Sequence, residues 1–249
     1  MVFGRKALGG GDSGVEAQRQ HLARTETALV NVEQGIARLP GYKAQFADAW
    51  FDSPEVAEAI ERVRQAREIL DQIKAQVAAA SQASPVIEQH LGTIDELVAL
   101  RLIVLDSFAA VLIGRQHIWN GGAHAPGSPF NPTVREAQQA LHADASRLAH
   151  AVQEHIDELR PLREQHQAYW PPNLNLEHLQ AYLDDGRKAL DTYSDQFAAH
   201  DQPLPPQASI ELLVLAQRME GGVEMIETER QNLAVTIVTR NALKNSART

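Results

Sequence analysis

Cysteine is absent from this 249-residue chain, which excludes disulfides, thiolate metal ligands, iron–sulfur clusters and a cysteine nucleophile. Aromatic residues make up only 5% of the sequence, and glycine and proline gather at a few breaks. Sandwiches, barrels and propellers need many turns and aromatic-rich strands, so this composition disfavours them. Alternation of apolar and polar residues is nowhere long enough to predict a strand.

Basic residues are the scarcer charge: 23 Lys and Arg stand against 32 Asp and Glu, giving a formal net charge of −9. The acidic excess falls within residues 41–200, so both ends are close to neutral. Because an acidic body repels phosphate backbones, we do not expect nucleic-acid binding. Residues 1–11 lack the apolar core and cleavage site of a secretory signal, and we expect a cytoplasmic protein.

Apolar residues recur every seven positions between the breaks, with a second series three or four positions away. Two segments show these rows clearly: Val56, Ala59, Val63, Ala66, Leu70, Ile73 and Val77 in one, and Leu176, Leu179, Leu183, Leu190, Tyr193 and Phe197 in the other. This period predicts amphipathic helices. The fold class that follows is all-α: an elongated antiparallel helical bundle with coiled-coil-like heptad seams. We expect six main helices and one short helix at Lys43–Phe51. Ser13 and Glu16 form a capping box that predicts the first helix start, and Pro40-Gly41 predicts its end.

The domain organisation follows from the same breaks. We expect a disordered leader at residues 1–12, a single helical-bundle domain at 13–245 and a flexible tail at 246–249. The loop at 120–132 is rich in glycine and proline, and it is where composition favours a subdivision of the domain.

The segment from Leu97 to Ile113 is the most apolar part of the chain, and it is apolar nearly all round. Such a helix is typical of the middle of a bundle. A membrane span needs ~20 apolar residues, and the segment carries Arg101 and Asp106, so a constitutive span is not expected. These two charges are five positions apart, about 140° around a helix. Each therefore needs a partner on a neighbouring helix.

The ten histidines do not show the i, i+3 or i, i+4 histidine spacing of a helical metal site. Phosphate-binding loops and nucleophile elbows are also missing from the sequence. We therefore predict no catalytic residues, cofactor or metal site. His155 and His166 fall on the apolar seam, where the ordinary interpretation is a packing residue with a hydrogen bond to a facing helix. The alternative hypothesis is that these are pH-sensitive packing positions, because a charged imidazole resists burial.

Long apolar seams without a catalytic constellation favour a non-enzymatic helical scaffold that acts through protein–protein association. We expect a homo-oligomer, and the sequence does not identify another partner. One alternative is a membrane-active protein that shelters the 97–113 helix and makes peripheral membrane contact. A second is a metal-dependent enzyme with ligands gathered from distant histidines. The residues most suited to contact a partner or membrane are apolar or basic and lie near the ends or the central loop: Phe3, Arg5, Lys6, Trp119, Arg240 and Lys244.

Overall fold

The computed structural model describes residues 10–121, 131–171 and 174–246. In these ranges the chain forms six α-helices, one short 3-10 helix and no strand, which confirms the all-α helical bundle. The elements in chain order are α1 (Gly10–Gln45), α2 (Pro54–Ala79), α3 (Pro85–Asn120), α4 (Val134–Gln165), η1 (Gln167–Tyr169), α5 (Leu176–Ala199) and α6 (Pro206–Ser246).

The chain divides into two compact units, Met1–Ala109 and Ala110–Thr249, called here the N-terminal and the C-terminal unit. The division falls inside α3, whereas sequence composition pointed to the loop at 120–132. The N-terminal unit therefore holds α1, α2 and most of α3. The C-terminal unit holds the last turns of α3 with α4, η1, α5 and α6.

Ion pairs and hydrogen bonds give the helix directions in the N-terminal unit. Arg67 of α2 binds Glu33 of α1 through two nitrogens, at 2.8 and 2.6 Å, and Lys74 binds Glu26. From Arg67 to Lys74 the residue numbers rise along α2, while those of their partners fall from Glu33 to Glu26 along α1, so these helices run antiparallel. In contrast, α3 runs parallel to α1, because Gln18 meets Ser84 at 2.8 Å and Gly35 meets Leu105.

The core of this unit is best defined along α2. Its buried residues are the seven positions that the two heptad rows predict: Val56, Ala59, Val63, Ala66, Leu70, Ile73 and Val77. Ser53 caps this helix by accepting a hydrogen bond from the backbone N–H of Val56, which satisfies one of the four free donors at the helix start.

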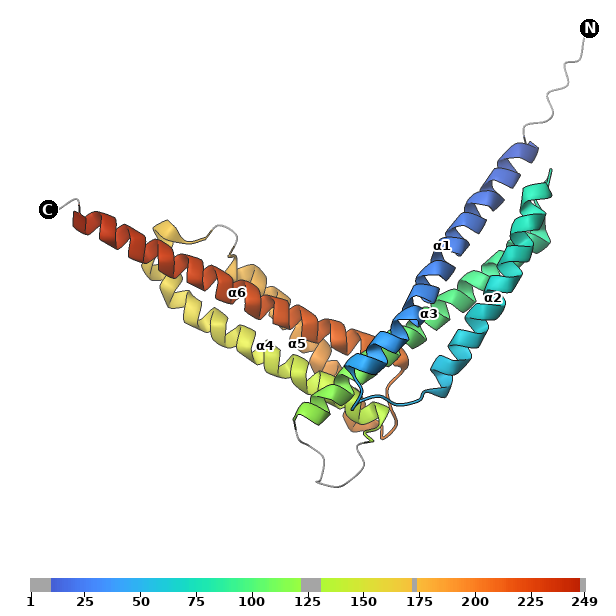
Figure 1. The fold of residues 1–249 in the computed structure, drawn as a ribbon. Coiled ribbons are helices and arrows are strands. Elements are labelled where there is room, and N and C mark those ends of the chain that lie inside the picture. Colours follow the sequence, from blue (N-terminus) through green and yellow to red (C-terminus); the bar gives the residue numbers. More distant parts are fainter. Residues whose placement is uncertain (1–9, 122–130, 172–173, 247–249) are drawn as a thin grey trace, which may run out of the picture. The chain divides into compact units, whose positions relative to one another are not determined.

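The C-terminal unit repeats the same up–down–up pattern. Contacts between α4 and α5 run antiparallel, since Arg163 meets Glu177 and Arg135 meets Phe197. Those between α4 and α6 run parallel, because Gln138 meets Ser209 and later residues meet later ones. In Figure 1, α4, α5 and α6 lie side by side along most of their length. Their facing stripes form one buried core that extends from Leu141 to Ile226 in sequence.

The predicted ends of the first helix were wrong. The helix α1 continues through Pro40 to Gln45, so the expected short helix at Lys43–Phe51 is absent: its first three residues belong to α1, and a turn follows at residues 46–49. Proline removes one helical hydrogen bond, but the rings of Tyr42 and Phe46 are in edge contact across the next turn, 6.3 Å apart. At its start α1 begins at Gly10, so Ser13 is not the N-cap. Starting the helix one turn earlier costs little, because the first four N–H groups of a helix have no partner within the helix wherever the helix begins.

Candidate interaction surfaces

Four of the six residues expected to contact a partner lie outside the described side chains: Phe3, Arg5, Lys6 and Lys244. Trp119 lies in the last turn of α3 and is half-buried. The Arg240 guanidinium lies over the Tyr169 ring, 4.5 Å from its centre. A cation–π contact at an exposed site contributes about 0.5–1 kcal/mol, so Arg240 joins α6 to η1.

The two charges on the apolar part of α3 lie beside neighbouring helices. Arg101 has a nitrogen 3.5 Å from Glu58 of α2, while its Nε is buried without a hydrogen-bond partner in the described part of the chain. Asp106 is exposed as a whole residue. Partial burial of its carboxyl group raises the pKa of Asp106, and the positive charge of Arg38 on α1 opposes this rise.

His155 and His166 have different surroundings. The ring of His155 lies 3.8 Å from Glu158 of its own helix and 3.8 Å from Glu227 of α6. The pH hypothesis had assumed that the surroundings of His155 are purely apolar, whereas two carboxylates lie near its ring. His166 is the C-cap of α4, where its backbone N–H donates to the carbonyl of Leu162 at 2.9 Å.

Sequence reasoning missed a histidine that lies between two helices. His21 of α1 contacts Glu88 through Nδ1, and its Nε2 lies 2.8 Å from Asp95. Both carboxylates belong to α3 and lie 67 and 74 residues away in sequence, so no local motif marks them. One signal was available: the two acids are a heptad apart, which places them on one side of a helix.

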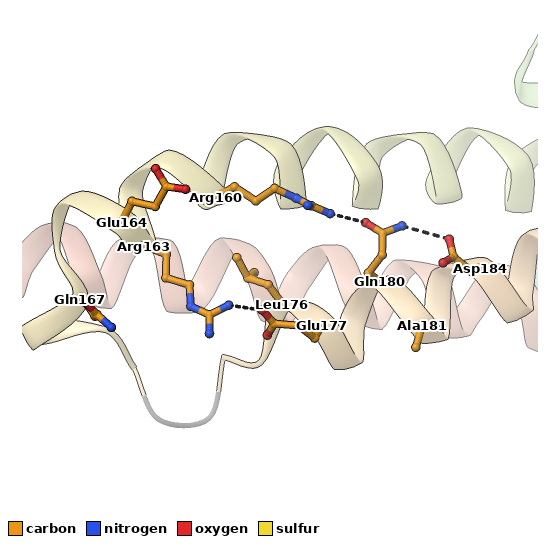
Figure 2. Close-up of a pocket in the computed structure, with 9 residues that line it drawn as sticks. All are labelled: Arg160, Arg163, Glu164, Gln167, Leu176, Glu177, Gln180, Ala181 and Asp184. Atoms are coloured by element: carbon orange, nitrogen blue, oxygen red, sulfur yellow. Dashed lines mark hydrogen bonds and ion pairs between the residues drawn. The ribbon is translucent and has the colours of Figure 1, made fainter.

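A groove of about 700 Å³ lies between the end of α4 and the start of α5, and Figure 2 shows the side chains along it. Arg163 pairs with Glu177 at 2.5 Å. Gln180 accepts a hydrogen bond from Arg160 at 2.9 Å and donates one to Asp184 at 3.0 Å. These charged and amide groups therefore satisfy one another across the groove.

A second groove, of about 510 Å³, is mostly apolar and lies where α1, the following turn and α2 meet in the N-terminal unit. Trp50 and Phe51 contact Phe108 with ring centres 5.3 and 5.0 Å apart. The Lys43 ammonium group lies 5.5 Å from the centre of the Trp50 ring. Several of the chain's few aromatic residues thus gather at this end of the unit.

The helix α3 leaves part of its apolar surface uncovered. Within the described residues it is the helix that is long and apolar enough to cross a membrane by length and composition, with a window of 18 residues at mean hydropathy 2.2. Only 44% of that window is buried. Leu100 is 59% exposed, and Ala99 and Ile103 lie beside it on the same side of the helix. We call these three residues the α3 apolar face.

Within the described ranges, no group of three or more His, Cys, Asp and Glu side chains is placed so that it could hold a metal ion. Comparison with known proteins found no match to this chain among family models, curated proteins or solved structures. The function proposed below therefore rests on the residues and contacts of the chain itself.

Proposed function

We propose that this protein is a non-enzymatic helical scaffold of the cytoplasm that acts through protein–protein association, including self-association. The observation that carries the proposal is the α3 apolar face on the most apolar helix of the chain. A single exposed leucine is ordinary on a protein surface, whereas adjoining apolar side chains on a largely apolar helix are typical of an interaction site.

The arrangement of the N-terminal unit supports this proposal. On the core side of α3, Leu91, Ile94 and Val98 are buried. Ile94 lines a groove with Ile73 of α2, and Val98 lines another with Ala28 of α1. At 100° per residue, Leu100 and Ile103 point roughly opposite to Val98. A further helix laid on this face would bury it with the coiled-coil-like geometry that heptad seams favour. The outer side of α2, in contrast, carries the Glu61–Arg64–Glu68 ion-pair cluster.

Self-association should weaken when the α3 apolar face is made polar. We expect size-exclusion chromatography with light scattering to give a mass above the 27.4 kDa of one chain. Leu100→Gln should weaken association about tenfold, because burying a leucine side chain contributes about 1.5–3 kcal/mol and a tenfold change in affinity corresponds to about 1.4 kcal/mol. Ile69→Gln is the matched control, since Ile69 is also exposed but lies on α2, and it should leave the mass unchanged. A wild-type protein that stays at 27.4 kDa at every concentration contradicts self-association.

The same apolar helix favours a second candidate function, contact with a membrane. Its length and hydropathy are sufficient for a span, although Arg101 and Asp106 would each oppose insertion by roughly 2.5–3.5 kcal/mol near the bilayer centre. In this alternative the helix is sheltered in the soluble form and inserts after the N-terminal unit opens. The net charge of −9 also disfavours approach to anionic lipids.

Vesicle flotation separates these two functions. A scaffold should remain in the bottom fraction with both neutral and anionic vesicles. A membrane-active protein should float, and should lose this property either in Leu100→Gln or after deletion of residues 1–11, which removes Phe3, Arg5 and Lys6. Deletion of 1–11 thus tests the N-terminal basic segment, and the substitution tests α3. Flotation of the wild type that either variant reduces would overturn the scaffold proposal in favour of the membrane.

A further inference from the structure

The imidazole of His21 bridges two carboxylates on one side of α3. Its Nδ1 contacts Glu88 Oε1, and its Nε2 lies 2.8 Å from Asp95 Oδ2. Because Glu88 and Asp95 are seven positions apart, they lie two turns from each other along the same face of the helix. The ring lies between them and is mostly buried, while both carboxylates keep access to solvent.

This geometry requires a specific protonation state. A neutral imidazole has one N–H, and its other nitrogen is an acceptor. An ionised carboxylate only accepts hydrogen bonds. Both contacts can therefore be hydrogen bonds only when both ring nitrogens carry a proton, which makes the ring an imidazolium. With a neutral ring, one nitrogen lone pair would face a carboxylate oxygen and that contact would be repulsive.

We propose that His21 is a pH-dependent clasp that holds α1 against α3. The protonated ring binds both carboxylates, and the neutral ring releases one of them and loosens the contact between the two helices. The start of α3 stays attached by a separate contact, since the Gln18 side chain both donates to and accepts from the Ser84 backbone. Loosening would therefore begin beyond that point, in the groove of about 470 Å³ that His21 and Asp95 line together with Val98 and Leu102.

The charged groups around the clasp define its surroundings. On α1, Arg24 lines the same groove, and on α3 the facing charges are Glu88 and Asp95. The charged residues of α2 that face α1 are engaged in their own ion pairs: Arg67 with Glu33 and Lys74 with Glu26. The carboxylates of Glu88 and Asp95 are therefore the groups that set the charge of His21.

The direction of the pH effect follows from these contacts. Hydrogen bonds to Glu88, and next to Asp95, raise the pKa of His21 above its ordinary 6.5. A group whose pKa is higher in the folded than in the unfolded state stabilises the fold fully below the unfolded pKa. That stabilisation is lost as the pH rises through the folded pKa. The clasp should thus be closed in mildly acidic solution and should loosen as the pH rises through the raised pKa of His21.

The test compares His21→Gln with a histidine control across the same pH range. Urea unfolding of the wild type, His21→Gln and His150→Gln would be measured from about pH 5.5 to about 8.5, where histidine titrates. His150 is a suitable control because it is exposed and lies 3.3 Å from a single carboxylate, that of Glu154. The wild type and His150→Gln should lose stability with rising pH, and His21→Gln should lack the part of this dependence that the clasp supplies.

Equal pH dependence in His21→Gln and the wild type would overturn the proposal. A second measurement on the unmodified protein does not depend on how a variant folds. In an NMR titration the ring resonance of His21 should have a midpoint above 6.5, and amide exchange in α1 near His21 should accelerate over the same pH interval. A midpoint at or below that value would also overturn the proposal.

Discussion

Gly114→Ala should destabilise the C-terminal unit by about 3 kcal/mol, the cost expected when a side chain is forced into a filled space. A Cβ atom on Gly114 would lie 2.9 Å from the carbonyl carbon of Ala137 and closer still to its oxygen. These are backbone atoms of α4, so no rotamer change can relieve the overlap. The two helices would have to separate, which opens the packing around Ala110 and Leu141 in the buried core.

The sign of this effect is informative because helix propensity predicts the opposite. In an uncrowded helix interior, alanine is more favourable than glycine by about 1 kcal/mol. Gly221→Ala provides the control, since nothing lies within 4 Å of a Cβ at this position of α6 in the same unit. We expect that control to stabilise the unit by up to about 1 kcal/mol. Urea unfolding followed by circular dichroism measures both variants, and a stabilised Gly114→Ala would contradict the close approach of α3 and α4.

A third glycine shows why the identity of the neighbouring atom matters. A Cβ on Gly186 of α5 would overlap the terminal methyl group of Met219 on α6. The thioether side chain has three rotatable bonds and can move aside, so the loss here should be smaller than at Gly114. The stability lost when a glycine of this unit is replaced by alanine therefore depends on whether backbone or a flexible side chain lies beside it. The sequence does not show which of these is the neighbour.

Single apolar stripes were the part of the fold that sequence reasoning predicted best. On α2 and α5 the apolar rows are narrow, so the same residues can face the core in only one way. All seven expected positions on α2 are buried, as are the six on α5: Leu176, Leu179, Leu183, Leu190, Tyr193 and Phe197. A helix that is apolar all round gives no such direction. The pattern of α3 could not show that Val98 would face the core while Leu100 stayed exposed.

The features that prediction missed depend on contacts between residues far apart in the chain. Pro40 is the exception, a local miss: it looked like a helix end because its local effect is unfavourable, yet α1 continues to Gln45. His21 looked isolated because its acidic partners come from α3. The same holds for Gln138, which occupies a polar position in the sequence of α4 and is nevertheless completely buried. Its role follows from the segment that it binds.

Gln138→Met should destabilise the C-terminal unit by about 3–4 kcal/mol, since it leaves several buried polar groups without partners at roughly 1–3 kcal/mol each. The Gln138 amide donates to the carbonyl of Leu204 at 3.0 Å and to the Ser209 hydroxyl at 2.9 Å. Its oxygen accepts from the backbone N–H of Leu204 at 2.9 Å. Methionine has a similar length and shape but provides neither function, so the variant isolates the hydrogen bonds from the packing.

The neighbouring sequence explains why this one glutamine is so important. Leu204 lies between Pro203 and Pro205, and Pro206 follows. Proline has no backbone N–H, so Leu204 provides the one backbone donor in that stretch. Leu204 is also buried, where an unpaired N–H is costly. Gln138 satisfies both backbone groups of Leu204 at once and thereby fastens the α5–α6 connection to α4.

Two measurements check this prediction and separate it from a general loss of packing. Gln139→Met, at the exposed neighbouring position, should change stability by less than about 0.5 kcal/mol. Amide exchange of Leu204 should accelerate in Gln138→Met before other amides of the C-terminal unit do, because its acceptor has been removed. Since Ser209 lies in the first turns of α6, loss of the same anchor should also loosen the start of that helix against α4. Unchanged exchange at Leu204 would mean that water or another group replaces Gln138, and the connection would then not depend on α4.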